Sequence, residues 1–109
     1  MNQKRPPPIR SKTHRLWIQS LACSVSGCYR PPEGHHVRWG FYTLARKPGD
    51  DKLVPLCRIH HDEIEHGAKS FEAKYGVDLK LVADTLWTMS PGNPANEGGL
   101  QWADHIPRR

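Results

Sequence analysis

The chain has 109 residues, of which 37% are hydrophobic, and it contains ten prolines and nine glycines. This length suits one domain, and so small an apolar core commonly needs a bound metal or another cross-link for stability. The net charge of +5 favours a polyanionic partner. No stretch reaches the roughly 18 apolar residues of a membrane span, and the N-terminus lacks the apolar core of a secretory signal. We therefore expect a soluble, cytoplasmic protein without a membrane partner.

The first part of the chain is predicted to form an arm, a helix and a turn-rich segment. Residues 1–11 are basic and rich in proline, so we expect a flexible arm. Ser11 or Thr13 can cap a helix over HRLWIQSL. The segment CSVSGCYRPPEG at 23–34 is rich in turn formers and suits a metal-binding loop. The predicted apolar side of the helix consists of Leu16, Trp17 and Leu21.

A strand, turn, strand, helix order is predicted in the middle of the chain. One strand begins at His36 and runs to Trp39, and ARKPGDD after it is a strong turn signal. A second strand follows in KLVPL, where Pro55 implies an edge position or an early end to pairing. Cys57 then opens a polar, histidine-rich helix that Gly67 closes.

Two more helices and a tail complete the expected domain, which spans residues 12–90. SFEAKYG is predicted to form a short helix with Ser70 as its cap. DLKLVADTLWTM is predicted to form a longer helix that Asp78 caps and that stops before Pro91. Residues 91–109 have no sustained period, so we expect an irregular or disordered tail. The side of the longer helix that should pack on the strands consists of Leu79, Val82, Leu86 and Met89.

The cysteines point to a structural zinc ion. Cys23 and Cys28 form one short-spaced pair, and Cys57 and His60 form another. Zinc takes four thiolate or imidazole ligands, commonly supplied as two such pairs that the fold brings together. An odd count of three cysteines also argues against a disulfide framework. The alternative is three small buried cysteines beside a coincidental histidine.

A second group of residues surrounds two histidine doublets, at 35–36 and 60–61. Together with WIQSLAC, EGHHVR, DDKLVPLCRIHHDEIEH and SFEAKYGVDL, the chain resembles the HNH endonucleases of the phage-type, Ref-like group. The resemblance covers residues 11–87. It implies an α+β fold of the small ββα-metal (His-Me finger) type, with a structural zinc and flanking helices. It also implies metal-dependent hydrolysis of DNA phosphodiester bonds in phage recombination, repair or DNA processing, in the host cytoplasm if the protein is phage-encoded.

The resemblance also implies a role for individual histidines. His35 would bind a catalytic metal ion, and His36 would be the general base that activates water. His61 falls on the family's last histidine and would be a second ligand of that ion. Because one step along a helix turns the side chain by about 100°, His60 can face the zinc while His61 faces the catalytic ion. Whether that ion is Mg²⁺, Mn²⁺, Ni²⁺ or Zn²⁺ stays open.

The sequence departs from the family pattern between the two strands. The family's asparagine would fall near Lys52, whose ammonium group cannot accept a hydrogen bond from an imidazole. Asp51, one residue earlier, can substitute as the acceptor. A further metal ligand stays open between Glu65, which helical spacing favours, and His66, which ligand chemistry favours. It is an equal alternative that both are solvated helix residues.

Basic residues near the doublets suggest how DNA would be held. Arg38, Arg46 and Lys47 are candidates for phosphate contacts, although a solvated turn would look the same. The expected partners are DNA and a recombinase, packaging or other DNA-processing protein, and the oligomeric state stays open. A catalytically decayed, zinc-stabilised DNA-binding or assembly module is the alternative, motivated by the missing asparagine. Retention of the three histidines at 35, 36 and 61 favours the nuclease.

Overall fold

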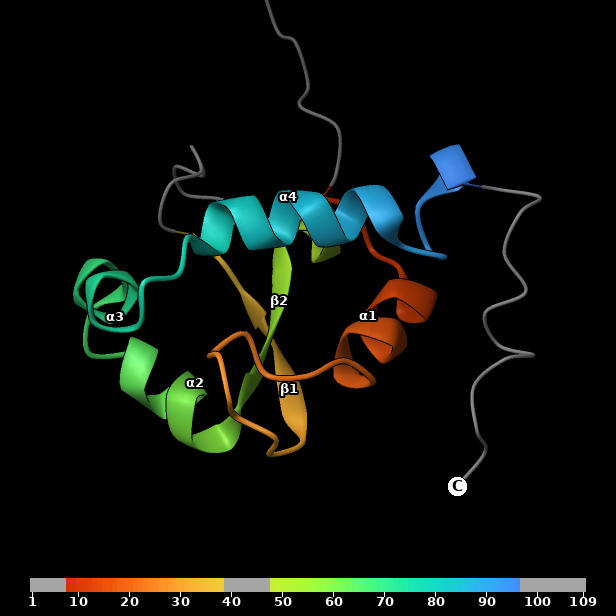
Figure 1. The fold of residues 1–109 in the computed structure, drawn as a ribbon. Helices are drawn as coiled ribbons and strands as arrows, with labels where there is room; N and C mark the ends of the chain where they lie inside the picture. The colour runs from red at the N-terminus through yellow and green to blue at the C-terminus, as the bar shows by residue number, and fades with distance from the viewer. Residues whose placement is uncertain (1–7, 39–47, 97–109) are drawn as a thin grey trace, which may run out of the picture.

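The computed structural model describes residues 8–38 and 48–96. Within these ranges four α-helices surround a two-stranded antiparallel sheet, so the protein is a small α+β domain (Figure 1). Among the same residues, no helix combines the length and apolarity that a bilayer crossing requires. Trp39, Arg46 and Lys47 of the sequence predictions lie outside the described ranges.

Helix α1 (Lys12–Gln19) begins at Ser11, whose hydroxyl accepts the backbone N–H of His14 at 3.1 Å. The sequence allowed either Ser11 or Thr13 as the cap. Thr13 lies inside the helix, so Ser11 is the cap. The buried side chains of α1 are His14 and Ile18, one helical turn apart. Leu16 was predicted to be on the apolar side but is 46% exposed, because it points about 200° away from both of them around the helix.

The sheet pairs β1 (Pro32–His36) with β2 (Leu53–Cys57). The first strand was predicted to begin at His36, but it ends there. The five residues of β2 pair with His36 and with the four residues that precede it. Gly34 allows the close packing at its centre, since a Cβ there would lie 3.2 Å from Leu53 Cδ2. All five residues of β2 are buried, including Pro55, which lies opposite Gly34. A short 3₁₀ turn, η1 (Asp50–Lys52), leads into β2.

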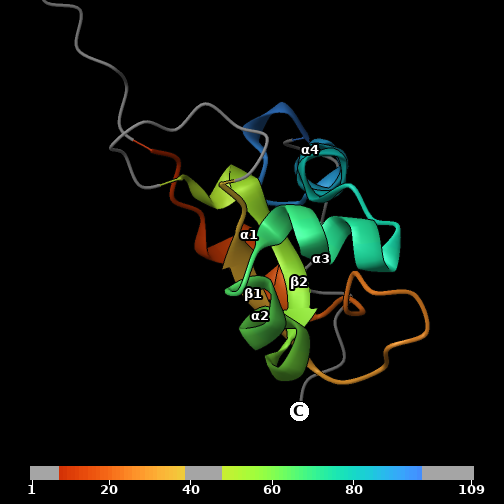
Figure 2. The same ribbon diagram turned by 90° about the vertical axis from the view of Figure 1, so that its left-hand side faces the viewer.

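Helix α2 (Arg58–Ile64) begins directly after β2, and α3 (Ala68–Tyr75) follows it. Gly67 was predicted to close α2, but it precedes α3 with a φ of 143°. A residue other than glycine rarely adopts this backbone angle, so Gly67 makes the sharp turn between the two helices. Ser70 lies inside α3 and is not its cap. Figure 2 shows segment 20–31, in orange, next to the end of β2 from which α2 starts.

Helix α4 (Leu79–Met89) crosses the sheet and begins at Asp78, whose carboxylate accepts the N–H of Leu81 as the sequence predicted. Leu79 and Ala83 are buried against β2 and its neighbours. Met89 was predicted to pack but is 59% exposed, since the last turn of α4 extends past the strands (Figure 1). After α4 the chain forms a 3₁₀ turn, η2 (Pro94–Asn96).

The core lies between the sheet and helices α2, α3 and α4. Its aliphatic and aromatic members pack directly against the three cysteines, which are also buried. The protein therefore places its sulfur atoms where water is excluded. The other core residues are Val25, Val37, Val54, Leu56, Ile64, Phe71, Leu79 and Ala83.

Candidate active site and metal centre

The first centre consists of the four side chains that the sequence predicted as zinc ligands. Cys23, Cys28, Cys57 and His60 are all buried, and their potential ligand atoms lie within 4.8 Å of one another. Cys28 Sγ is 3.7 Å from Cys57 Sγ, and His60 Nδ1 is 3.4 Å from Cys23 Sγ and 3.2 Å from Cys57 Sγ. A zinc ion about 2.3 Å from each of two sulfurs in a tetrahedron would hold those sulfurs about 3.8 Å apart. These residues are therefore close enough to hold a metal ion, and their spacing fits a tetrahedral one.

Local structure explains why the four residues meet. Gly27 takes a φ of 81°, which lets the chain turn between Cys23 and Cys28. Cys57 ends β2 and caps α2, and its sulfur accepts the N–H of His60 at 3.4 Å. Burial raises the pKa of the Cys23 thiol, whereas the backbone N–H of Arg30 lowers the pKa of the Cys28 thiol. Backbone donors aimed at sulfur stabilise the thiolate form that binds metal.

The second centre is a pocket of about 360 Å³ on the other side of α2. His35 and His36 reach it from β1, and His61 reaches it from α2. The ring centroids of His35 and His61 are 4.9 Å apart with an angle of 72° between the rings. Burial lowers the pKa of His35 to about 4, and the nearby charges of His61 and His36 add to this shift. The ring of His35 is therefore neutral near pH 7 and keeps a lone pair for a metal ion. The remaining lining residues are Gly34, Arg38, Ile64, Glu65 and Ala68.

Glu33, which the sequence analysis did not single out, orients His61. Its carboxylate accepts a hydrogen bond from His61 Nδ1 at 2.7 Å, and Arg58 Nη1 lies 3.6 Å from its other oxygen. This bond with His61 lowers the pKa of Glu33, and the nearby charge of Arg58 lowers it further. Because Nδ1 of His61 donates its hydrogen to Glu33, Nε2 carries the lone pair when the ring is neutral. A carboxylate that fixes an imidazole in this way is the usual outer partner of a metal-binding histidine.

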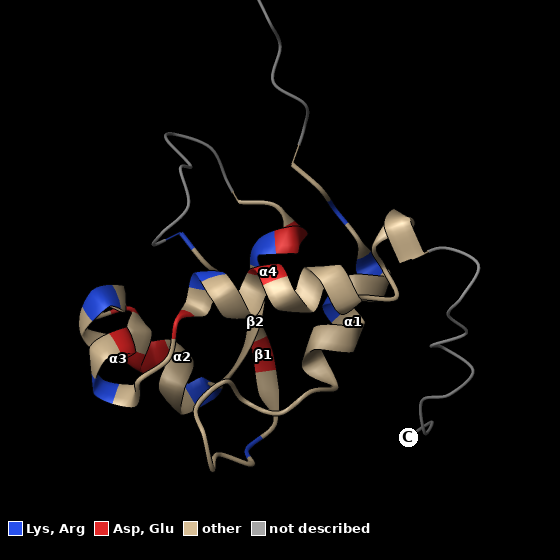
Figure 3. Ribbon diagram, turned by 45° about the horizontal axis from the view of Figure 1, so that its top comes forward, with Lys and Arg blue, Asp and Glu red and all other residues tan. Residues whose placement is uncertain are grey.

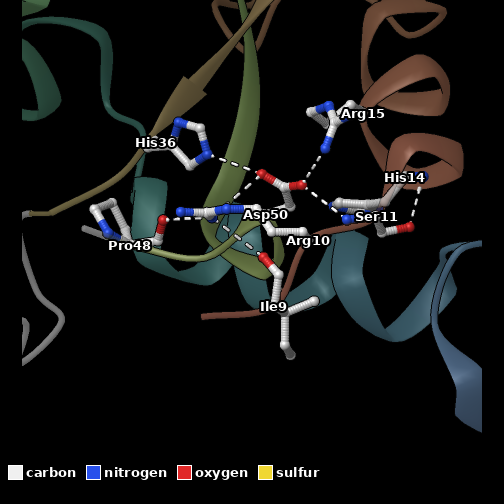
Figure 4. Close-up of polar contacts among 8 residues, drawn as sticks. All are labelled: Ile9, Arg10, Ser11, His14, Arg15, His36, Pro48 and Asp50. Carbon is white, nitrogen blue, oxygen red and sulfur yellow. Dashed lines mark hydrogen bonds and ion pairs between the residues drawn. The ribbon is translucent and has the colours of Figure 1, made fainter. Parts of the chain in front are cut away.

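Asp50 is the acceptor for His36. Its Oδ1 is 3.0 Å from His36 Nε2, while its Oδ2 accepts the N–H of Ser11 at 2.8 Å and Nη1 of Arg15 at 2.7 Å (Figure 4). Burial alone would raise the pKa of Asp50, but the hydrogen bonds from Ser11, His36 and Arg15 lower it below its usual value. The carboxylate is therefore ionised near neutral pH.

This arrangement differs from the sequence prediction, which chose Asp51 for the same task. Asp51 instead lies 2.8 Å from Lys52 Nζ. Asp50 and Asp51 both belong to η1. A 3₁₀ helix turns successive side chains by about 120°, so only one of these two carboxylates can point inward. The structure buries Asp50 at 1% exposure, whereas the side chain of Asp51 is 17% exposed.

The structure also separates the two candidates for a further ligand. Glu65 lines the pocket with His35 and His61, whereas His66 lines a separate pocket of about 140 Å³ with Lys74. In the described part of the chain, the Cys3His set is the one group of three or more residues that could hold a metal ion. Glu65 thus lines the same pocket as His35 and His61 but does not form a ready ligand group with them.

Arginine side chains lie around the second centre. Arg38, which the sequence analysis named as a candidate phosphate contact, is exposed and lines the pocket. Arg10 and Arg15 are about half exposed beside Asp50, and sequence analysis missed them there. Figure 3 shows the basic positions that lead into α1 close to the acidic positions of η1.

Residues 1–90 match a family that is described as "Protein of unknown function (DUF968)". The chain belongs to the DUF968 family. This DUF968 protein is 32% identical over 79 residues to "Uncharacterized protein YdfU" of Escherichia coli (strain K12). The match covers 72% of the DUF968 chain and 22% of the relative, so the chain spans about a fifth of the relative's length. No solved structure matches the chain.

Proposed function

We propose that this DUF968 protein is a metal-dependent endonuclease of the HNH type that hydrolyses DNA phosphodiester bonds. The observation that carries the proposal is the convergence of His35, His36 and His61 on one open pocket. They come from a strand and the helix after the second strand, and the described elements follow in the order β1, η1, β2, α2. The cluster at Cys57 and His60, which we infer to bind structural zinc, fixes the start of that helix.

His36 is suited to activate water. Its Nε2–H bond to Asp50 leaves Nδ1 as the nitrogen that can accept a proton, and neutral imidazole performs this task near neutral pH. As Nδ1 takes the proton, the oxygen of the water attacks phosphorus. The bond between phosphorus and the 3′-oxygen then breaks, and the 3′-oxygen takes a proton from solvent.

His35 and His61 would hold the catalytic ion. When bound, this ion supplies positive charge that polarises the phosphate and stabilises the leaving 3′-oxygen. Two imidazoles alone favour Zn²⁺ or Ni²⁺. If the side chain of Glu65 turns toward them as a third ligand, its carboxylate also suits Mg²⁺ or Mn²⁺.

Basic residues near the pocket would bind the DNA. The chain carries a net charge of +5, and Arg38 stands at the pocket edge where a phosphate would pass. Arg46 and Lys47 are proposed as further phosphate contacts. We place the activity in phage recombination, repair or DNA processing in the host cytoplasm, beside a recombinase or packaging protein.

One observation favours a second candidate, a zinc-stabilised module that binds DNA or assembles with other proteins without cutting. Within the described ranges, the Cys3His cluster is the group that could hold a metal ion, and His35 and His61 form no such group with a third residue. A decayed nuclease would keep the thiolate cluster and lose the arrangement of ligands that holds a catalytic ion.

A plasmid-nicking assay distinguishes the two candidates. Supercoiled DNA is incubated with the native chain, His36→Ala or His66→Ala in Mg²⁺, Mn²⁺, Ni²⁺ or Zn²⁺. We expect His36→Ala to lower the rate by about 100-fold or more, as removal of a general base does. His66→Ala is the matched control, because it removes a histidine from a separate pocket and should cut at the native rate.

The same assay can contradict the proposal in two ways. Equal rates for the native chain and His36→Ala would remove His36 from the mechanism. A native chain that binds DNA and retains its zinc, yet cuts with none of the four metals, would establish the binding module instead.

A further inference from the structure

The carboxylate of Asp50 is held by groups that lie far from it in the sequence. Ser11 and Arg15 both bind Oδ2, and only Oδ1 is left to face His36. Arg10 Nη1 lies 3.8 Å from Oδ1. With Oδ2 fixed by two donors at 2.8 and 2.7 Å, the carboxylate has little freedom to rotate.

The backbone on both sides holds this arrangement in place. The N–H of Asp50 donates to the carbonyl of Ile9 at 2.8 Å, and Arg10 Nη1 donates to the carbonyl of Pro48 at 3.2 Å. A Cβ on Gly49 would lie 2.8 Å from the backbone nitrogen of Ile9. Only glycine therefore lets segment 9–11 lie this close to η1, and Figure 4 shows Ile9, Arg10 and Ser11 next to Asp50.

This geometry determines which nitrogen of His36 is basic. An ionised carboxylate only accepts hydrogen bonds, so Nε2 of His36 must carry a hydrogen, and in the neutral ring the lone pair then lies on Nδ1. Arg10 and Arg15 supply the counter-charge of Asp50. Asp50 can therefore accept the Nε2–H of His36 without a positive charge on the His36 ring.

We propose that Arg15, together with the N–H of Ser11, positions the general base by fixing Asp50, so that the start of α1 is part of the catalytic apparatus. The role of His36 as base rests on the proposed function, whereas the control of its tautomer does not. Arg15 is a positioning residue, because it acts through Asp50 and does not line the pocket that would meet the substrate.

The test compares Arg15→Gln with Lys12→Gln in the full, zinc-loaded chain. Both variants remove one positive charge from α1, but Lys12 is exposed and makes no contact with Asp50 in the structure. The tautomer is measured by the ¹⁵N chemical shifts of the His36 ring, assigned with His36→Gln. The second readout is plasmid nicking, separated into kcat and KM.

We expect the native chain and Lys12→Gln to show a single tautomer protonated at Nε2. Arg15→Gln should show a mixture of both tautomers, and kcat should fall by about tenfold while KM changes less than about twofold, because an interaction with the base acts in the transition state. Arg15→Lys keeps the positive charge and an N–H donor for Asp50, and should restore most of both signals. If Arg15→Gln does not fold, Arg15→Lys and Asp50→Asn carry the test, with Asp50→Asn expected to give mixed tautomers.

A single Nε2–H tautomer in Arg15→Gln, or in Asp50→Asn if Arg15→Gln does not fold, would overturn the inference. A mixture in Lys12→Gln equal to that in Arg15→Gln would overturn it too, because the effect would then be one of general charge. If the native chain cuts no DNA, the proposed function fails, and the tautomer measurement still decides the role of Arg15.

Discussion

Replacing Cys28 with serine should unfold this protein, because a zinc ion in the thiolate cluster would contribute more stability than a domain of this size can lose. Four-ligand zinc sites contribute about 10–16 kcal/mol of apparent binding free energy. The free energy of unfolding of small domains is only about 5–15 kcal/mol. Loss of most of the metal affinity therefore removes a contribution as large as the whole margin.

The structure shows why no other contacts replace the cluster. The cluster joins segment 23–28 to the end of β2 and to the first turn of α2, and its members are at most 9% exposed. Helix α2 has seven residues and is too short to persist without packing. Without the ion, Cys57 and His60 remain buried as polar side chains beside the apolar core.

The assay measures bound zinc by atomic emission, secondary structure by far-UV circular dichroism and the midpoint of thermal unfolding. Cys28→Ser should bind little or no zinc and show no cooperative transition at 25 °C or above. Ser26→Ala is the matched control, because Ser26 is an exposed residue of the same turn and should keep both zinc and stability. A Cys28→Ser protein that lacks zinc and still melts at the native temperature would refute the reasoning.

Three further predictions concern the core, the pocket and the pH dependence of stability. Leu56→Ala should lower the free energy of unfolding by about 2–5 kcal/mol in urea denaturation, since Leu56 is fully buried. Glu33→Gln should weaken binding of the proposed catalytic ion by about 10- to 100-fold in a metal titration, since the variant loses the carboxylate that orients His61, while the content of structural zinc stays native. The lowered pKa of Asp50 means that its carboxylate stabilises the fold above its ordinary value of 3.8 and loses this effect as the pH falls below it. The stability difference between the native chain and Asp50→Asn should therefore be largest near neutral pH and shrink on acidification.

Each of these predictions has a result that contradicts it. A loss under about 1 kcal/mol for Leu56→Ala would mean that the core collapses around the deletion. Native metal affinity in Glu33→Gln would show that His61 needs no orienting partner. A stability difference for Asp50→Asn that is the same at pH 3 and pH 7 would show that ionisation of Asp50 does not contribute to stability.

The features that the sequence predicted well depend on residues close together along the chain. The Cys3His set was found because its two pairs have short, typical spacings, and the structure brings all four residues together. The cap at Asp78 is likewise a local contact, over three residues. The α+β class is confirmed for the same reason, since local patterns located most of the elements. Assignment of the fold to the HNH type stays a prediction.

The features that the sequence predicted badly depend on distant contacts. Asp50 and Asp51 are adjacent acidic residues, and only the docking of Ser11 and Arg15 makes Asp50 the buried one. Those contacts span 39 and 35 positions, which no spacing rule covers. Gly67 was misplaced for a different reason, since a glycine between two helices can end the first or begin the second.

The direct succession of His60 and His61 restricts how this sequence can diverge. His60 belongs to the thiolate cluster, and His61 belongs to the pocket on the other side of the same seven-residue helix. An inserted or deleted codon in this turn would rotate everything beyond it by about 100°. Either His60 would then point away from the thiolate cluster or His61 would point away from the pocket. Relatives should therefore vary freely at the exposed neighbour Asp62 but keep the length of this turn unchanged.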